Sequence, residues 1–439
     1  MSRREILRDR GIRALVVGET ISIAGSQMTY IVLPWFVLTT TGSAVRTSIV
    51  VAAEMAPVAF LGLASGTIVS RLGARRTMII SDVSRALLLG TIPVLHLLEV
   101  LTFPLLVGLV FGIGAFLVPH ATAQRVLVPE LVGEDEGRVG EVQSLIQVAW
   151  AVAGIAGPAI GGILIGLIGE TNVLFIDAAS FALSAMLLAS FVHPKHFAEA
   201  PEDEKTGVIA GVRFLFRDAL LRVWMLSITG INVVWSAFGV MFPVLVLERY
   251  GEHPEILGWI LGAFGVGAIV GSVASFGVIA RFDRIVLASW ASAGQTAVIW
   301  LLFPDLPWPV VAAAAMVAGV FAPVLNSTVI TTRTMRTPPF LRASVHAAAV
   351  TVALILAPLG ALAAGPLLHL WGLDAAIAVF LALNTLCGIA FVAAGVRERR
   401  APSGAAYGSR TRTDDPFPAA SATATSTTTP EAVRPSRTR

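Results

Sequence analysis

The sequence predicts an all-α membrane protein with twelve transmembrane helices, which form two parallel six-helix repeats with both termini in the cytoplasm. Three observations support this prediction: long apolar stretches, a one-sided distribution of Lys and Arg, and residues that recur at a nearly constant offset. A helix needs about 20 mainly apolar residues to cross a hydrocarbon layer of roughly 30 Å. The predicted spans are 13–39, 45–69, 77–97, 102–124, 142–168, 171–192, 221–247, 256–279, 285–303, 308–330, 343–367 and 372–396.

The composition fits a chain that lies mostly within a lipid bilayer. Hydrophobic residues make up 56% of the 439 residues, and charged residues make up 13%. This charged share is about half of that in soluble domains. The 40 Gly and 24 Pro residues are typical of membrane helices that pack closely. The single cysteine, Cys387, has no partner for an internal disulfide.

The basic residues predict the orientation of the helices. Of the 31 Lys and Arg residues, 28 lie on segments that share a side with the N-terminus. Arg46 and Arg249 lie on the opposite side, and Arg85 lies inside the third span. Because basic loops stay in the cytoplasm, we expect a multi-pass protein of the bacterial cytoplasmic membrane with both termini inside. The first span lacks a signal-peptide cleavage site and is expected to be retained.

Matching residues in the two halves of the chain predict an internal repeat. Their offset shrinks steadily along the sequence, as loop trimming between duplicated halves would produce. The pairs are Pro34 and Pro243, Arg71 and Arg281, Pro119 and Pro323, Arg138 and Arg342, Pro158 and Pro358, and the runs that begin at Asp177 and Asp374. Parallel repeats of this kind place a substrate path at the interface between the halves.

The repeat and the polar segments predict four regions. Residues 1–193 and 221–398 form the N-terminal and C-terminal six-helix bundles. Residues 194–220 form a cytoplasmic linker, in which apolar residues at helical spacing predict a short helix on the membrane surface. Residues 399–439 include a Ser/Thr/Ala-rich run that cannot bury a core, so a disordered tail is expected.

The loop between the second and third spans contains a run of Gly and Arg residues with a characteristic spacing. The run from Gly66 to Arg76 resembles the G-x-L-A-D-R-x-G-R-R loop of the major facilitator superfamily, and Gly66, Arg71, Gly73 and Arg75 match in register. In that family the Asp contacts the N-terminus of helix 11 and helps to lock the cytoplasmic side. Ser70 replaces this Asp, and the hydroxyl group can still cap a helix without an anion–dipole contribution of about 0.3–1 kcal/mol. A basic loop that only fixes topology is the alternative.

Further stretches resemble the branch of this superfamily that contains macrolide-efflux proteins and the enterobactin exporter, the transmembrane secretion effectors. In the fifth span, Gly157, Pro158 and Gly161 match a G-P-x-x-G-G element of exporters. The other matching stretches are Leu38–Ser43, Ser81–Ala86, Leu127–Glu130 and Phe175–Phe181. The R-x-x-Q-G pattern of many proton-coupled exporters does not occur in the fourth span, which instead contains His120, Gln124 and Arg125.

Small residues four apart predict faces where helices approach closely. They are Gly157 and Gly161, Gly267 and Gly271, and Ala361 and Gly365. In the superfamily, spans 5 and 8 and spans 2 and 11 face each other across the two halves. These residues therefore fit a sliding interface between the halves as well as plain dense packing.

Ionisable residues inside the spans are the candidate proton sites, since a charge at the bilayer centre costs about 2.5–3.5 kcal/mol on insertion scales. Glu54 lies near mid-depth of the second span without a basic neighbour on its own helix, and it is the predicted proton carrier. Glu19 lies nearer the inner end, where a snorkelling or gate-paired role is as plausible as proton handling. Asp82 and Arg85 are spaced for a structural ion pair. Asp177 is expected near the outer end of the sixth span, in helix packing or an outer gate.

Several other polar and aromatic residues are candidates for the lining of a central cavity. Aromatic residues and a single His more often pack within membrane proteins, and this remains the alternative for each of them. The candidates are Trp35, His120, Gln124, Asn232, Trp235 and Asn326.

The motifs together predict a secondary active exporter of an amphipathic small molecule, such as a drug, a macrolide-like or a siderophore-like compound, in exchange for protons. The chain contains no H-E-x-x-H, C-x-x-C, P-loop or G-x-S-x-G motif, so no enzyme, cofactor or metal site is predicted. The expected partners are a small-molecule substrate, protons and lipid, without nucleic acid or an obligate protein partner. An inward permease for a polar nutrient and a non-transporting sensor are the alternatives.

Overall fold

The computed structural model describes residues 9–133, 136–193, 204–279, 281–302, 304–338 and 341–400. All regular elements in these ranges are helices, which confirms the predicted all-α class for the described chain. The predicted disordered tail, except for residues 399 and 400, and the first part of the linker, 194–203, lie outside the described residues.

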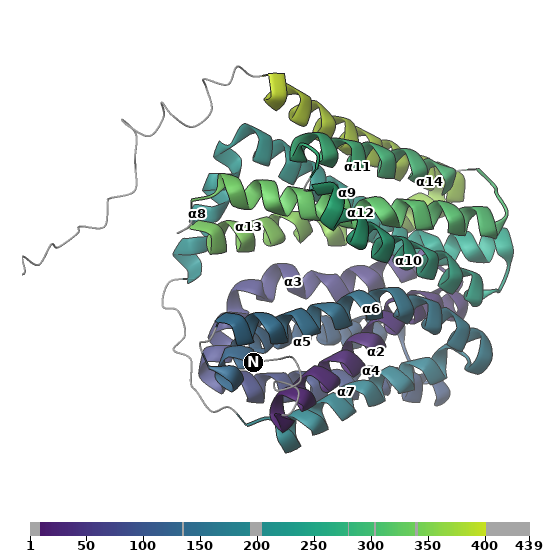
Figure 1. The fold of residues 1–439 in the computed structure, drawn as a ribbon. Helices are drawn as coiled ribbons and strands as arrows, with labels where there is room; N and C mark the ends of the chain where they lie inside the picture. Colours follow the sequence, from purple (N-terminus) through teal and green to yellow (C-terminus); the bar gives the residue numbers. More distant parts are fainter. Residues whose placement is uncertain are drawn as a thin grey trace, which may run out of the picture. The chain divides into compact units, whose positions relative to one another are not determined.

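The first half of the chain forms six long helices and the second half follows after a short one (Figure 1). The first six are α2 (Arg10–Thr41), α3 (Ala44–Leu72), α4 (Ala74–Leu97), α5 (Phe103–Val132), α6 (Glu136–Ile168) and α7 (Glu170–Phe191). The short helix α8 (Glu204–Arg217) precedes α9 (Ala219–Tyr250), α10 (Pro254–Ile279), α11 (Arg284–Ile299), η1 (Trp300–Leu302), α12 (Trp308–Arg336), α13 (Arg342–Leu354) and α14 (Ala357–Arg400).

Ten segments of the described chain are long and apolar enough to cross a membrane. The last of them, Ser344–Arg400, contains both the eleventh and the twelfth predicted span. It has two interruptions: Ile355 and Leu356 separate α13 from α14, and Gly372 leaves the helical conformation with φ 79° and ψ 174°. The predicted second span coincides with α3.

Equivalent helix ends recur in the two halves. The carboxylates of Asp9 and Asp218, 209 residues apart, each accept from two backbone N–H groups in the first turn of α2 and α9. Gly42 and Gly251 end the same helices at positive φ, again 209 residues apart. Gly169 and Gly372 lie 203 residues apart, at φ 81° and 79°, before the sixth and twelfth predicted spans.

The offset at these last two glycines corrects one predicted pair. The matched runs at Asp177 and Asp374 are 197 residues apart, so they are six positions out of register with Gly169 and Gly372. Asp177 lies inside α7, whereas Asp374 lies at the end of the bundle and forms an ion pair with Arg249. The two aspartates are therefore not equivalent.

Close helix contacts also recur between the halves. A Cβ atom on Gly114 of α5 would collide with the backbone carbonyl of Glu54 on α3. A Cβ atom on Gly319 of α12 would collide with the carbonyl of Phe264 on α10 in the same way. The two glycines are 205 residues apart and their partners 210 residues apart, so Phe264 is the counterpart of Glu54.

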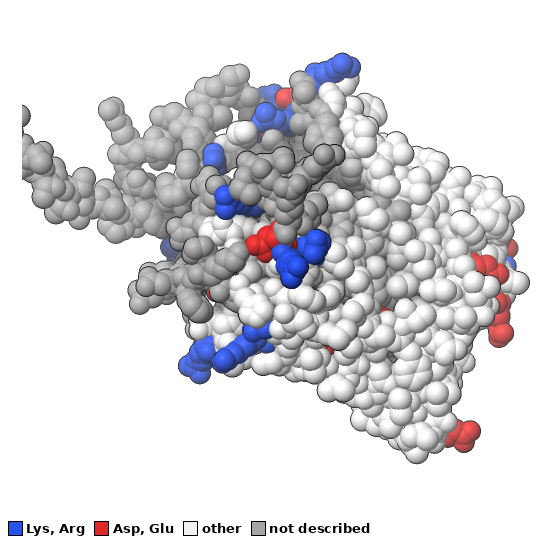
Figure 2. Space-filling view, turned by 60° about the horizontal axis from the view of Figure 1, so that its bottom comes forward, with Lys and Arg blue, Asp and Glu red and all other residues white. Residues whose placement is uncertain are grey.

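The ends of the bundle differ in charge (Figure 2). Lys and Arg gather at the end where α3 gives way to α4, which we call the basic end. Asp and Glu dominate the opposite end, where α2 gives way to α3, which we call the acidic end.

The two halves share an apolar core at the acidic end. This core contains buried side chains of the first half, such as Phe36 and Val50, and of the second half, such as Val240 and Ile260. Toward the basic end the cores are separate. One contains Met78, Leu127 and Leu188 of the first half, and another contains Trp224, Ala288 and Phe391 of the second half.

Helix α8 differs from the predicted surface helix in its contacts. Leu215 is fully buried in a cluster with Val345 and Ala348 of α13, and Gly211 lies against the carbonyl of Ser344. The apolar face of α8 therefore packs against α13 of the second half, where small side chains leave room for it. It differs in this from the predicted helix on the membrane surface.

Candidate functional site

A buried cluster of ionisable side chains lies among four helices of the first half. It consists of Glu19 on α2, Asp82 and Arg85 on α4, His120 on α5 and Asp177 on α7, each 6% exposed or less. The Nε2 atom of His120 lies 3.1 Å from Oδ1 of Asp82 and 3.4 Å from Oε1 of Glu19. One imidazole thus bridges two carboxyl groups from two other helices.

Arg85 is fixed by three neighbours. Its Nη2 atom donates a hydrogen bond to Oγ of Ser26 on α2 at 3.0 Å, and its Nη1 atom lies 4.0 Å from Oδ1 of Asp82. Its guanidinium carbon lies 3.8 Å from the ring centroid of Phe181, in the geometry of a cation–π contact. Arg85 therefore provides a fixed positive charge within the cluster.

Asp177 completes the cluster on α7. Its Oδ1 atom accepts a hydrogen bond from Oγ of Ser180 at 2.9 Å. A Cβ atom on Gly25 of α2 would collide with this carboxylate, so only glycine lets the two helices approach here.

The structure corrects several local expectations for these residues. Glu19 is 4% exposed and contacts His120, so its side chain does not snorkel toward the membrane surface. The predicted ion pair of Asp82 with Arg85 is present at 4.0 Å, and Asp82 lies nearer still to His120, at 3.1 Å. Asp177 is 1% exposed and lies seven residues into α7, in helix packing and not at an outer gate.

Glu54 lies apart from this cluster, near the seam between the halves. It is half-buried on α3, and its carboxyl group is within electrostatic range of Arg85 and Asp177. The next residue, Met55, accepts a hydrogen bond at its Sδ atom from Ser236 of α9 at 3.3 Å. Tyr30 of α2, 48% exposed, also reaches α9, because its hydroxyl lies 3.2 Å from the Cβ position of Gly239.

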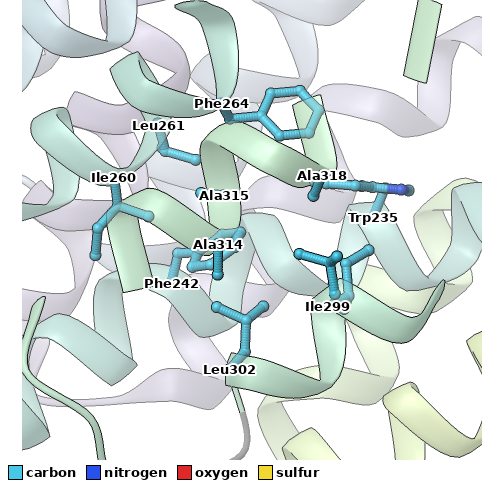
Figure 3. Close-up of a pocket in the computed structure, with 11 residues that line it drawn as sticks. Trp235, Phe242, Ile260, Leu261, Phe264, Ile299, Leu302, Ala314, Ala315 and Ala318 are labelled. Atoms are coloured by element: carbon cyan, nitrogen blue, oxygen red, sulfur yellow. The ribbon is translucent and has the colours of Figure 1, made fainter. Parts of the chain in front are cut away.

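An apolar pocket lies on the other side of this seam, within the second half (Figure 3). The ring of Trp235 packs against Phe264 and Phe238, at centroid distances of 5.1 and 6.0 Å. The lining contains only apolar side chains and the indole of Trp235; it consists of Trp235, Phe242, Ile260, Leu261, Phe264, Val298, Ile299, Leu302, Ala314, Ala315 and Ala318. Phe264, the counterpart of Glu54, is thus part of an apolar surface.

The remaining cavity candidates are scattered. Trp35 is 3% exposed and packs in the shared core, so it does not line the described pocket. Gln124 donates to Gln143 of α6 at 3.4 Å. Asn232 is half-buried on α9, and Asn326 is exposed on α12.

The predicted gating loop forms a tight turn at the basic end. Gly73 has φ 81° and ψ 147°, a conformation that is essentially restricted to glycine. Ser70 is exposed and donates to the carbonyl of Thr67 on its own helix, so it caps no other helix here. Arg75 donates to the carbonyls of Leu188 and Ala189 near the end of α7.

Three other predicted gating residues, Gly66, Arg71 and Arg125, differ in their exposure. Gly66 is half-buried on α3, whereas Arg71 and Arg125 are exposed at the basic end of their helices.

The small-residue faces differ from the prediction in one respect. Gly157 and Gly161 of α6 pack on α2 of the same half, against Gln27 and Met28, and Pro158 is buried beside them. The contact of α6 with α10 is made by the next residue, Gly162, which lies against Gly258.

The other predicted faces divide in the same way. Gly267 and Gly271 of α10 pack on carbonyl groups of α12 within the second half. Gly365 of α14 contacts Ser48 of α3, as predicted for spans 2 and 11. The sequence spacing identified the helix faces that carry small residues, but it did not identify the helix against which each face packs.

The comparison with known proteins decides the family. Residues 5–423 match the family described as transmembrane secretion effector, in the major facilitator superfamily. This chain belongs to that family. It is a multi-pass transporter of the cell membrane and not an enzyme.

Its relatives include two pumps from mycobacteria. The chain is 31% identical over 377 residues to the multidrug efflux pump Tap of Mycolicibacterium fortuitum, covering 82% of this chain and 89% of the relative. It is 28% identical over 395 residues to Tap of Mycobacterium tuberculosis, covering 86% and 92%.

Solved structures support the fold. The nucleoside transporter NupG superposes with a TM-score of 0.72 at 13% identity, covering 87% of this chain and 98% of NupG. A bacterial homologue of the human lysosomal transporter Spinster, in an inward-facing state, superposes with a TM-score of 0.69 at 12% identity, covering 90% and 98%. At such identities the likeness shows the fold alone.

Proposed function

We propose that this transporter is a secondary active exporter that moves amphipathic small molecules out of the cell by alternating access, in exchange for protons. The observation that carries the direction of transport is the 31% identity, over most of both chains, to a protein named as a multidrug efflux pump. The absence of a P-loop motif in the sequence favours an ion gradient as the energy source.

The distribution of the cores supports alternating access. In our proposal the twelve predicted spans form two six-helix bundles, 1–193 and 221–398, connected by the linker 194–220. The shared core at the acidic end closes that end, and the separate cores at the basic end allow the halves to part there. Because basic residues mark the cytoplasmic side, this arrangement is an inward-facing state with both termini in the cytoplasm.

The seam supports an amphipathic substrate. The pocket around Trp235 and Phe264 offers an apolar and aromatic surface, and Glu54 and Tyr30 bring a carboxyl and a hydroxyl group to the seam on the opposite half. In this proposal the apolar body of the substrate contacts the aromatic surface of the second half, and its polar or cationic group contacts Glu54 or Tyr30. A permease for a polar nutrient would require hydrogen-bonding groups where the pocket has only apolar side chains.

In this proposal Glu54 exchanges protons at the seam, and Glu19 assists deeper in the first half. Glu54 is half-buried, which suits a carboxyl group that must reach water in at least one state. The remaining candidates, Asn232, Asn326 and Gln124, contribute polar groups along the path.

Ethidium accumulation in cells tests the proposed function. Cells that produce the protein should accumulate less ethidium than cells with an empty vector, and a protonophore should abolish the difference. Glu54→Gln has nearly the same volume and cannot ionise, so its producer cells should resemble the empty-vector cells. Equal accumulation with and without wild-type protein would refute ethidium export; a difference that survives the protonophore would refute proton coupling.

A further inference from the structure

We infer that the protons exchanged during transport are stored at a three-residue site formed by Glu19, Asp82 and His120. This inference rests on the proposed antiport and deepens it, because it assigns the proton store to side chains away from the seam. Each residue comes from a different helix, so the site exists only in the folded bundle.

The distances at His120 point to a proton shared between the imidazole and the two carboxyl groups. Its Nε2 atom faces one carboxyl oxygen at 3.1 Å and a second at 3.4 Å, and no other described residue forms a hydrogen bond with it. A neutral Nε2 atom that carries no hydrogen can approach two carboxyl oxygens only if they bear protons. A protonated Nε2 atom satisfies one carboxylate and leaves the other to share the same proton or hold its own.

The charge balance of the buried cluster gives the number of protons. The cluster contains three carboxyl groups, one guanidinium and one imidazole, all buried. With the carboxyl groups ionised and the imidazole neutral, the net charge of these buried side chains would be about −2, which is strongly unfavourable in the interior of a helix bundle. One proton on the imidazole and one on a carboxyl group make the cluster neutral.

All charged groups around the site fit this balance. Arg85 lies beside Asp82 on α4, and contacts with Ser26 and Phe181 hold its guanidinium group within the cluster. Asp177 faces Arg85 from α7 with a hydrogen bond from Ser180. Glu54 is half-buried on α3, and in this proposal it exchanges protons between the three-residue site and water.

The second half provides an internal control for a purely structural role. The counterpart of His120 is Val324, which follows Pro323 as His120 follows Pro119. The offset of 209 residues between Asp9 and Asp218 makes Ile228 the counterpart of Glu19. Helices α4 and α11 begin 210 residues apart, so the counterpart of Asp82 is Ser292.

The three counterpart residues, Ile228, Ser292 and Val324, carry no ionisable group. Val324 is 8% exposed and Ser292 is 2% exposed, and the half-buried Ile228 packs against the apolar cluster that contains Val324. In the second half, the three equivalent helices therefore pack together without ionisable side chains at these positions. We infer that the ionisable side chains of the first half have a role beyond packing.

The test compares wild-type protein, His120→Gln and the matched control His253→Gln in proteoliposomes. His253 is exposed on the loop between α9 and α10, so it repeats the chemical change outside the cluster. Under an imposed pH gradient, ethidium movement and proton movement, reported by entrapped pyranine, are recorded together. Wild type and His253→Gln should move ethidium uphill with counterflow of protons, whereas His120→Gln should move ethidium only downhill and without protons.

A second measurement does not depend on the substrate. Infrared spectroscopy of the purified proteins follows the C=O stretch of protonated carboxyl groups as the pH is raised. The pH at which this band disappears should change in His120→Gln and stay constant in His253→Gln. Glu19→Gln, in which one carboxyl group of the site is removed, should weaken the band and serves as the test if His120→Gln does not accumulate in the membrane.

The outcomes separate the two proposals. Wild-type protein that moves ethidium without counterflow of protons would overturn the antiport and, with it, the inference. Proton-coupled wild type together with an equally coupled His120→Gln would overturn the three-residue site alone. An unchanged infrared titration in both His120→Gln and Glu19→Gln would overturn it as well.

Discussion

The glycine contact between the halves at the acidic end predicts how a single methyl group shifts the transport cycle. A Cβ atom on Gly162 of α6 would lie 2.6 Å from Cα and 2.7 Å from the backbone N of Gly258, and 2.8 Å from the carbonyl O of Pro254. All three atoms belong to the backbone of α10, so no side chain can turn away to make room. Gly162→Ala should therefore push α6 and α10 apart at the end where the two halves share their core.

The size of the effect follows from the overlap. Overpacking by one methyl group in a tight contact costs about 1–3 kcal/mol. The cost applies to the state that is closed at the acidic end, whereas the gain in helix propensity from Gly to Ala applies to both states and cancels. The equilibrium should therefore shift by about 5–150-fold toward the state that is open at the acidic end.

Distances between spin labels, measured by double electron–electron resonance, report this shift in the equilibrium between the two states. Labels on Thr102→Cys in the first half and Asp305→Cys in the second lie on exposed positions at the acidic end, in a Cys387→Ser background. The ratio of protein with the longer distance to protein with the shorter distance should increase in Gly162→Ala by the factor given above.

The control is Gly140→Ala on the same helix, where a Cβ atom would meet no neighbour within 4 Å. Its distance distribution should match that of the wild type. Equal distributions for Gly162→Ala and Gly140→Ala would refute the assignment of the acidic end as a closed gate held by α6 and α10.

Four further predictions concern proton coupling, the gating loop and the topology. Glu54→Gln should abolish uphill export under a pH gradient, measured in proteoliposomes, and its loss from the membrane would instead show a structural role. Gly73→Val should slow transport at normal membrane levels, because Val at φ 81° costs about 1–3 kcal/mol of backbone strain while open space surrounds the Cβ position. Ser70→Asp should slow the labelling of cysteines on the cytoplasmic side of the cavity by favouring closure of that side. An impermeant maleimide added outside cells should label Asp305→Cys and not Glu202→Cys; outside labelling of the latter would refute the two-repeat topology.

The sequence located most helices because the signals are local. Apolar length marks a span, and residues such as Asp9, Asp218 and Gly42 end or begin helices through their own backbone contacts. Some predicted spans end before the helix does, because the helix continues beyond the apolar stretch. Helix α5, for example, runs to Val132 and not to 124, because Leu127, Val128 and Leu131 in its last turns still pack in the buried core of the first half.

The residues of the candidate site could be predicted from the sequence, but the contacts between them could not. All five members of the buried cluster were found, because an ionisable residue in a span is costly and therefore conspicuous. Local spacing paired Asp82 with Arg85, three residues away, whereas the structure puts His120 of another helix closer. Nothing in the spacing of Glu19 and His120 shows that their helices turn these two side chains toward each other.

The sequence by itself determined the helical class, the one-sided charge of the loops and the repeat, since each depends on composition or on residues near in the chain. The tertiary structure decided that Gly162, and not Gly157 or Gly161, meets α10, and that Asp177 and Asp374 are not equivalent. It also decided that one imidazole bridges Glu19 and Asp82 in the first half. Such contacts depend on the rotation of each helix about its axis, which is set by close packing against several neighbours at once and has no local signature.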